Sequence, residues 1–398
     1  ELAILFTRVS VFGVFFSAVT GIFANFLRIH DNFIIPALVG VPFNAIIIAS
    51  LFISARTNIY VLIYGSVLAT ASQLILYLPF LHKSGFRYSF RLKFKDDNLK
   101  KIIELGLPVM FSQSVNRINV LVDRTLASSL AVGGISALNY ADRINGFIKS
   151  FFVDSLATVL YPTISKMAAD GNVEGLKKTI GEAISIINLV VVPATVGAMI
   201  FSKEIVSLLF GRGAFSPEAI TMTGGALFFY SIGMIALGLR AIISRVFYAF
   251  QDTKTPTINS AITVATNIVF NLILMRSMGH AGLALATSIS VTPSTMWMYY
   301  RLRLKIGKLG LKKHLQNGLK ISGISLIMGV ISYFSYQGLF QLLGPGLIGT
   351  AIALGIAVML GVLVYGIMSY IFDVNIVRDT VNKTLSQLKK TLEKRKQK

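Results

Sequence analysis

The stretch "GLIGTAIALGIAVMLGVLVYGIMSYIF", residues 346–372, contains no charged residue and decides the fold class. An α-helix rises ~1.5 Å per residue, so this run is long enough to cross a hydrocarbon core of about 30 Å. Similar apolar runs recur along all 398 residues, which are 54% hydrophobic and only 14% charged, with a mean hydropathy of +0.70. Ordinary globular domains have about 25% charged residues. The sequence therefore predicts an all-α polytopic membrane protein.

Polar turns such as "DGNVEG" (170–175) and "DTKTPT" (252–257) divide the chain into eleven predicted spans. The absence of Cys excludes disulfides and thiolate sites, and the four His show no metal-ligand spacing. The predicted spans are Leu2–Phe26, Phe33–Ile53, Tyr60–Leu81, Ile102–Leu126, Ile135–Ile164, Ile180–Phe201, Ala219–Ile243, Thr257–Met275, Ala281–Tyr300, Ile321–Leu339 and Gly346–Phe372.

Lys and Arg gather in segments 82–101, 301–314 and 384–398, which fall on one side of the membrane if the spans alternate. Cytoplasmic loops are enriched in Lys and Arg, so the C-terminus is predicted to be cytoplasmic. The net charge of +21 then reflects these loops and predicts no nucleic-acid partner. The basic tail is expected to attract anionic lipids. Eleven spans put Glu1 outside without a signal peptide, so we expect an odd number of helices to be missing upstream.

Span 102–126 contains a polar stripe. Ser112, Asn116, Asn119 and Asp123 recur at helical spacing on one face. The adjoining face contains Gln113, Arg117 and Arg124. Interhelical hydrogen bonding explains Ser and Asn well, but it explains two Arg and an Asp poorly. We therefore expect this stripe to line a water-filled cavity.

Span 135–164 repeats the pattern within "ALNYADRINGF" (137–147) and the residues after it. Asn139, Asp142, Asn145 and Lys149 share one face, with Arg143 beside it. Charges at membrane depth are costly, and an excess of cations there is stabilised when an anion visits. Arg suits phosphate, so the sequence favours a phosphate or pyrophosphate substrate, although some Arg could instead snorkel to the interface. The cations at membrane depth are Arg8, Arg117, Arg124, Arg143, Lys149 and Arg240, against the acids Asp123, Asp142 and Asp154.

Asn267 and Asn271 lie one helical turn apart, with Thr287 a short loop further on. Together with Asp123 they offer only oxygen ligands, which suit a hard cation such as Na⁺. The same residue types also serve as packing contacts between membrane helices. Spacing alone does not decide between the two.

At "ALNYADRINGF", "LLFGRGAF" (208–215) and "RVFYAFQDTKTP" (245–256) the chain resembles the MurJ/MviN lipid II flippases of the multidrug/oligosaccharidyl-lipid/polysaccharide exporter superfamily. The resemblance implies an exporter fold of two six-helix lobes plus two C-terminal helices, with the first three helices absent here. It assigns 1–81 to the end of the N-lobe, 82–101 to a basic cytoplasmic linker, 102–305 to the C-lobe, 306–373 to the C-terminal pair and 374–398 to a basic tail.

The resemblance implies flipping of lipid II, the undecaprenyl-pyrophosphate-linked peptidoglycan precursor, across the bacterial cytoplasmic membrane by alternating access. It places Asp142 and Arg143 on a functionally important Asp–Arg position, and it implies a groove for the lipid tail at the C-terminal pair. Cell-wall synthesis or division proteins are implied partners. A sodium site found in some members matches Asp123, Asn267, Asn271, the Leu283 carbonyl and Thr287, but Asn271 stands where a carboxylate can occur.

The resemblance also implies that several cavity arginines of the family lie in the absent helices, so this sequence by itself is expected not to transport. Two alternatives stay open at this stage. One is an exporter of another polyprenyl-linked oligosaccharide or of drugs, although the excess of cations disfavours cationic drugs. The other is a membrane transferase, which would bring Mg²⁺ to a pyrophosphate through carboxylate clusters. The adjacent acids Asp96 and Asp97 have no such cluster beside them, so we expect no enzyme and no cofactor other than a coupling Na⁺.

Overall fold

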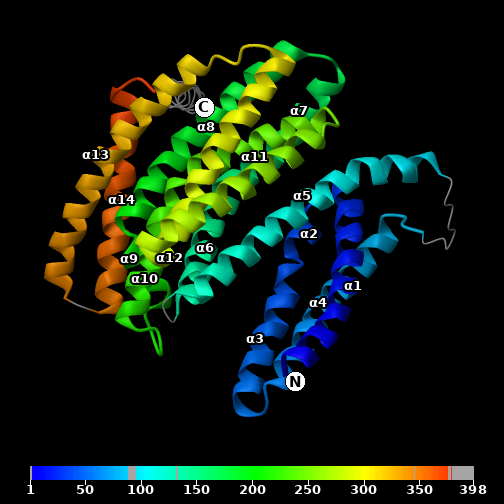
Figure 1. Cartoon of the computed structure of the whole chain (residues 1–398), viewed down its shortest axis with the longest axis horizontal. Helices are drawn as coiled ribbons and strands as arrows, with labels where there is room; N and C mark the ends of the chain where they lie inside the picture. The colour runs from blue at the N-terminus through cyan, green and yellow to red at the C-terminus, as the bar shows by residue number, and fades with distance from the viewer. Residues whose placement is uncertain (1, 88–95, 131–132, 345, 375–377, 379–398) are drawn as a thin grey trace, which may run out of the picture. The chain divides into compact units, whose positions relative to one another are not determined.

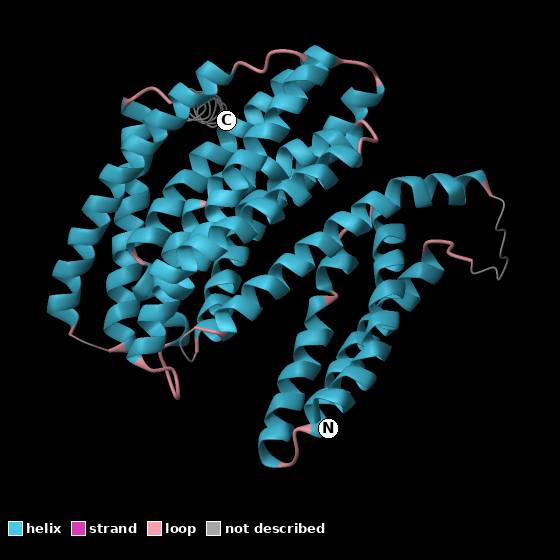
Figure 2. Cartoon of the chain, viewed as in Figure 1, coloured by secondary structure: helices cyan, strands magenta, loops and turns pink. Residues whose placement is uncertain are grey.

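The computed structural model describes residues 2–87, 96–130, 133–344, 346–374 and 378, and in this part of the chain the regular structure is helical throughout (Figure 2). The basic linker (at 88–95) and the basic tail (at 375–377 and 379–398) lie largely outside the described residues. The helices are α1 Leu2–Ile29, α2 Ile34–Leu38, α3 Gly40–Arg56, α4 Tyr60–Lys83, α5 Asp97–Ser128, α6 Gly134–Lys149, the π-helix η1 Ser150–Asp154, α7 Ser155–Ala169, α8 Val173–Ile200, α9 Ser202–Phe210, α10 Pro217–Ile232, α11 Met234–Ala249, α12 Lys254–Ile306, α13 Leu311–Leu343 and α14 Leu347–Ile371 (Figure 1).

Every predicted span falls on one or more of these helices, so the all-α prediction is confirmed. By length and composition, eight helices could cross a membrane, or nine if the bent pair α10–α11 counts as one span, within the described residues. The predicted number of eleven spans is higher for two reasons. Helix α5 is too polar to count as a span by composition, and α12 contains two predicted spans. The number of spans therefore stays a prediction.

The chain divides into two compact units, Glu1–Phe94 and Lys95–Lys398. The boundary falls inside the predicted linker. In the smaller unit, α1 and α3 both pack on α4, and Leu27, Ile35, Tyr77 and Leu81 form a buried cluster. Large hydrophobic side chains elsewhere on these helices stay exposed, as expected for surfaces that face lipid.

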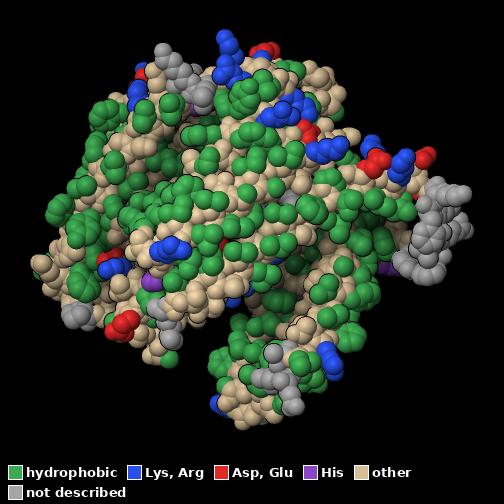
Figure 3. Space-filling model, in the orientation of Figure 1, with side chains coloured by type: hydrophobic (Ala, Val, Ile, Leu, Met, Phe, Trp, Pro, Cys, Tyr) green, Lys and Arg blue, Asp and Glu red, His purple; other side chains and the backbone are tan. Residues whose placement is uncertain are grey.

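The larger unit contains several apolar clusters, one of which is built mainly by α8, α11 and α12. Ile180, Ile243, Phe247 and Met298 are among its fully buried side chains. Figure 3 shows hydrophobic side chains over much of the visible surface of this unit and many of its Lys and Arg gathered at one end. This is the distribution expected for helices that pass through lipid and meet an anionic inner surface.

Helix α12 folds back on itself at Gly279, whose φ of 56° is outside the helical range. Thr263 donates to Ser294 (2.8 Å) and Asn267 contacts Thr287, so the two halves run antiparallel. Asn267 and Asn271 on the first half thereby come to face Leu283 and Thr287 on the second. Gly279 permits this reversal, since glycine adopts positive φ without strain.

The predicted span 219–243 is bent by 47° where α10 meets α11. Gly233 stands at this break, and a side chain there would meet the Cα of Ser288 at 3.0 Å. The Ser288 hydroxyl donates to the Phe229 carbonyl at 2.6 Å. The Phe229 carbonyl lies at the break in the helix, so the Ser288 hydroxyl supplies the hydrogen bond that the helix backbone would otherwise provide.

Candidate functional site

The polar side chains of the larger unit meet where α5 packs along α12. Thr257 of α12 donates to the Pro108 carbonyl of α5 at 2.8 Å, and further along, Asn271 of α12 donates to Asp123 of α5. The polar stripe of α5 is therefore directed at the polar face of the α12 hairpin. The side chain of Asn116, and that of Ser112, lie outside the described part of the structure.

An oxygen-rich cluster forms at this seam, and it contains the whole ligand set predicted for Na⁺. Asn271 donates to Asp123, and Thr287 donates to the Leu283 carbonyl at 3.1 Å. With its oxygen turned to Thr287 (3.2 Å), the Asn267 amide donates to Asp123 at 3.0 Å. The same orientation lets it donate to Asn119 at 2.9 Å, which adds Asn119 to the cluster.

The cluster fits a small hard cation in one specific respect. Oδ1 of Asn271 is buried and accepts no hydrogen bond within the described structure, a state that normally calls for a partner. The neighbouring oxygen atoms belong to a carboxylate, a hydroxyl, an amide and a backbone carbonyl. These are the groups that coordinate hard cations. No group of three or more His, Asp or Glu gathers among the described residues. A single carboxylate suits a monovalent cation better than a transition metal.

A second cluster contains Arg124 and Lys149, two of the predicted cations. Arg124 of α5 donates to Asn139 of α6 at 3.0 Å. Asp142 lies within electrostatic range of Arg124 and Lys149, and also of Asp123. The two clusters are therefore adjacent, so a charge arriving at one acts on the other.

Most of the predicted cations of α5 and α6 form no ion pair within the described residues. Ion pairs within the described part of the chain involve Lys149, Lys177, Lys305 and Arg378 only. The side chains without a carboxylate partner there include Arg117, Arg124 and Arg143, all exposed on the unit itself. Such a group favours an anionic ligand, because a carboxylate or phosphate would supply the missing counter-charge.

Two predicted positions stand apart from these clusters, and Lys149 has a partner besides Asp142. Arg240 of α11 is half-buried and donates to Thr263 at 3.3 Å, on the α12 hairpin. Arg8 belongs to α1 in the smaller unit. Lys149 forms an ion pair with Asp154 at 3.0 Å, a partner that the sequence did not predict.

The sequence also failed to indicate Tyr230. This side chain is only 9% exposed and lies within electrostatic range of Asp142, Asp123 and Arg124. Its helix α10 has apolar residues on every side, so no periodicity marks the face that turns toward the polar clusters. Tertiary packing alone determines its position.

An apolar groove of about 560 Å³ lies between α8, α13 and α14. Ile148 and Phe152, on the same span as Asp142, form one wall. The groove is suited to a hydrocarbon chain, because its walls offer dispersion contacts and few polar groups. The remaining lining residues are Leu189, Val190, Pro193, Ala194, Gly197, Ala198, Phe201, Ile205, Met328, Gly329, Ser332, Leu354, Val358, Gly361, Val362 and Tyr365.

The long apolar helices, with charged groups within them, define a polytopic α-helical membrane protein. Its fold is similar to the solved structure "Lipid II flippase MurJ, inward closed conformation", with a TM-score of 0.73, 25% identity, and 94% of this chain and 74% of that chain covered. A "multidrug resistance MATE family transporter of the MOP superfamily" shares the fold at a TM-score of 0.64 and 18% identity, covering 78% of this chain and 72% of its own.

The chain belongs to the family described as "Lipid II flippase MurJ", whose model matches residues 1–351. The "Probable lipid II flippase MurJ" of Vibrio cholerae is 31% identical over 310 residues, which cover 75% of this chain and 59% of that protein. The protein of the same description from Rickettsia prowazekii is 27% identical over 385 residues, covering 91% of this chain and 73% of its own length. The chain thus spans well under the full length of these relatives.

Proposed function

We propose that this chain provides the cation-rich lobe and the lipid-tail groove of a flippase for lipid II. The observation that supports it is that Arg117 and Arg124 of α5 and Arg143 of α6 form no ion pair in the described structure. A pyrophosphate would supply the missing negative charge, and guanidinium groups bind phosphate oxygens in a bidentate manner. The relatives from Vibrio cholerae and Rickettsia prowazekii are described as probable lipid II flippases.

The substrate is amphiphilic, and the larger unit offers matching surfaces. We assign the pyrophosphate to the cationic cluster and the polyprenyl tail to the groove between α8, α13 and α14. Asp142 lies within electrostatic range of Arg124 and Lys149, so its carboxylate offsets part of their positive charge when no anion is bound. Arg8 and Arg240 are proposed as further cations along the substrate's route, Asn116 and Asn119 as polar lining, and Arg143 as a direct phosphate contact.

We further propose Na⁺ as the coupling ion, held by Asp123, Asn267, Asn271, Thr287 and the Leu283 carbonyl. The ion would supply positive charge beside Asp142 without any proton transfer. The buried oxygen of Asn271 that accepts no hydrogen bond supports this assignment. Its binding would be linked to the anion through the electrostatic interaction between Asp123 and Asp142.

We place the protein in the bacterial cytoplasmic membrane with its C-terminus in the cytoplasm, on the basic segments of the sequence. Anionic lipids would contact these segments, and proteins of cell-wall synthesis or division would receive the product. We propose transport without bond-making chemistry. Metal-dependent turnover of a polyprenyl phosphate by the purified protein would overturn that view.

The experiment is translocation of labelled lipid II in proteoliposomes, with the protein expressed from its complete gene. Movement that is lost in Arg143→Ala and kept in Arg276→Ala, an exposed cation outside the cluster, would support the proposal. Transport of another polyprenyl-linked oligosaccharide but not lipid II would favour the alternative exporter. Equal movement by both variants would contradict the role of the cationic cluster.

A further inference from the structure

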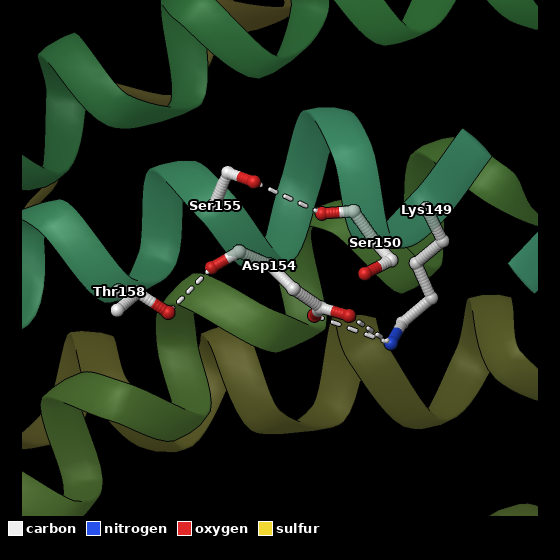
Figure 4. Close-up of polar contacts among 5 residues, drawn as sticks. All are labelled: Lys149, Ser150, Asp154, Ser155 and Thr158. Atoms are coloured by element: carbon white, nitrogen blue, oxygen red, sulfur yellow. Dashed lines mark hydrogen bonds and ion pairs between the residues drawn. The ribbon is translucent and has the colours of Figure 1, made fainter. Parts of the chain in front are cut away.

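The span formed by α6, η1 and α7 contains a π-helical turn at Ser150–Asp154. Lys149 Nζ lies 3.2 and 3.0 Å from the two carboxylate oxygens of Asp154, across this turn (Figure 4). The Ser155 hydroxyl donates to the Ser150 carbonyl, also five residues back, at 3.2 Å. Single π-turns inside α-helices are rare and frequently occur at functional sites.

The ion pair depends on the π-turn. In an α-helix, residues five apart point about 140° away from each other, because each residue turns the chain by ~100°. Lys149 and Asp154 would then lie on different faces of the helix. A π-turn has i→i+5 hydrogen bonds, which bring residues five apart nearly into line. The pair and the turn therefore stabilise each other.

The same turn forms part of the groove. Phe152, inside η1, lines the groove together with Ile148 one turn before it. Val153, the next residue, is 1% exposed and packs in a buried cluster with Ile187 and Ile242. A return of this segment to α-helical geometry would rotate Phe152 relative to the groove, because neighbouring side chains would have to re-register against α8 and α11.

Lys149 also faces the cationic cluster. It lies within electrostatic range of Asp142 while it is paired with Asp154, and both members of the pair are partly exposed, at 34% and 44%. A partly exposed ion pair contributes little to stability. An arriving anion with two or more charges can therefore replace Asp154 as the partner of Lys149.

We propose that Asp154 is a positioning residue, an internal counter-ion that holds Lys149 in the empty protein and is displaced by the substrate's pyrophosphate. Its release lets the π-turn relax toward an α-helix and moves Phe152 in the groove. Binding of the head group is thereby coupled to binding of the lipid tail in the groove. This inference rests on the proposed function for the identity of the anion, and on the π-turn for the coupling.

The chain contains no Cys, so two introduced cysteines suffice for spin labelling. Phe147→Cys and Val159→Cys flank the turn, at positions that are 70% and 72% exposed. They are about 18 Å apart along the helix axis at ~1.5 Å per residue, and would point about 120° apart if the segment between them were α-helical. The probes are undecaprenyl diphosphate and, as the uncharged control, undecaprenol.

The expected result is a shift of the inter-label distance by a few ångströms when the diphosphate is added and none with undecaprenol. Asp154→Asn is expected to show the shifted distribution without ligand, Asp154→Glu to keep the original one, and Asp170→Asn, at the end of α7, to leave it unchanged. Asp154→Asn without any shift would overturn the inference. That arm needs no ligand, so failure of the diphosphate to bind would instead contradict the proposed function.

Discussion

Replacing Gly233 with Ala tests how tightly the broken helix α10–α11 meets α12. An ideal Cβ at Gly233 would lie 2.9 Å from the Ser288 hydroxyl and 3.0 Å from its Cα. Contact with backbone cannot be relieved by a rotamer change, so α12 has to move away from α10. The Ser288 hydroxyl would then lose its hydrogen bond to the Phe229 carbonyl, now 2.6 Å long.

The expected loss of stability follows from these contacts. Overpacking a tight site costs about 1–3 kcal/mol, and the lost hydrogen bond adds about 1 kcal/mol. A total of about 2–4 kcal/mol corresponds to a fall in Tm of roughly 5–10 °C for a domain of this size. The assay is thermal unfolding of the purified protein in detergent, followed by circular dichroism.

Gly225→Ala provides the matched control, because Gly225 lies on α10 with nothing within 4 Å of the added Cβ. This change is expected to leave Tm unchanged or raise it slightly, since Ala favours a helix over Gly by ~0.5–1 kcal/mol. Ser288→Gly combined with Gly233→Ala should recover part of the loss. Equal Tm values for Gly233→Ala and Gly225→Ala would refute the close approach at this break.

Three further predictions concern other parts of the larger unit. Asp252 accepts hydrogen bonds from Thr255 and pairs with Lys305 at 3.5 Å. Burial raises the pKa of Asp252, but together these partners lower it by more, so the pKa lies below its usual value. The ionised carboxylate stabilises the fold by about 1 kcal/mol. This stabilisation is present at neutral pH and is lost as the pH falls through the folded-state pKa, so the Tm of the wild type should exceed that of Asp252→Asn by less below about pH 4. A Tm difference that does not change with pH would contradict this. Asn271→Asp places a second carboxylate beside Asp123, so NaCl, compared with choline chloride, should raise the Tm of the variant more than that of the wild type; equal shifts would argue against a cation there. Gly361 faces Ser332 and Met328 where α13 meets α14, so Gly361→Leu should lower Tm by several degrees whereas Gly355→Leu, with open space around it, should not.

The sequence could predict the helices and most of the polar residues because both leave a periodic signal. Apolar runs of bilayer length require helices, since no other segment satisfies its own backbone in lipid. The spacing of Asn119 and Asp123 predicted that they share one helix face. In the structure both accept hydrogen bonds from the Asn267 amide. A resemblance to a family supplied the Leu283 carbonyl, which no side-chain pattern can indicate.

The features that were missed arise from tertiary packing. The π-turn at Ser150–Asp154 depends on which carbonyl each N–H selects, and the residue types there do not specify that choice. Tyr230 lies on an apolar helix with no preferred face, so its proximity to Asp142 depends on how α10 packs on α6. Arg240 was predicted at membrane depth, but its contact with Thr263 required the fold of the α12 hairpin.

The central claim is that the cations of α5 and α6 bind a lipid-linked pyrophosphate. The most direct test is the affinity of the purified protein for undecaprenyl diphosphate compared with undecaprenol, in wild type, Arg143→Gln and the exposed control Arg276→Gln. A charge-assisted hydrogen bond contributes about 1.5–3 kcal/mol, so Arg143→Gln should weaken diphosphate binding about tenfold or more, while Arg276→Gln leaves it unchanged. Equal affinity for diphosphate and alcohol, or no loss in Arg143→Gln, would contradict the claim.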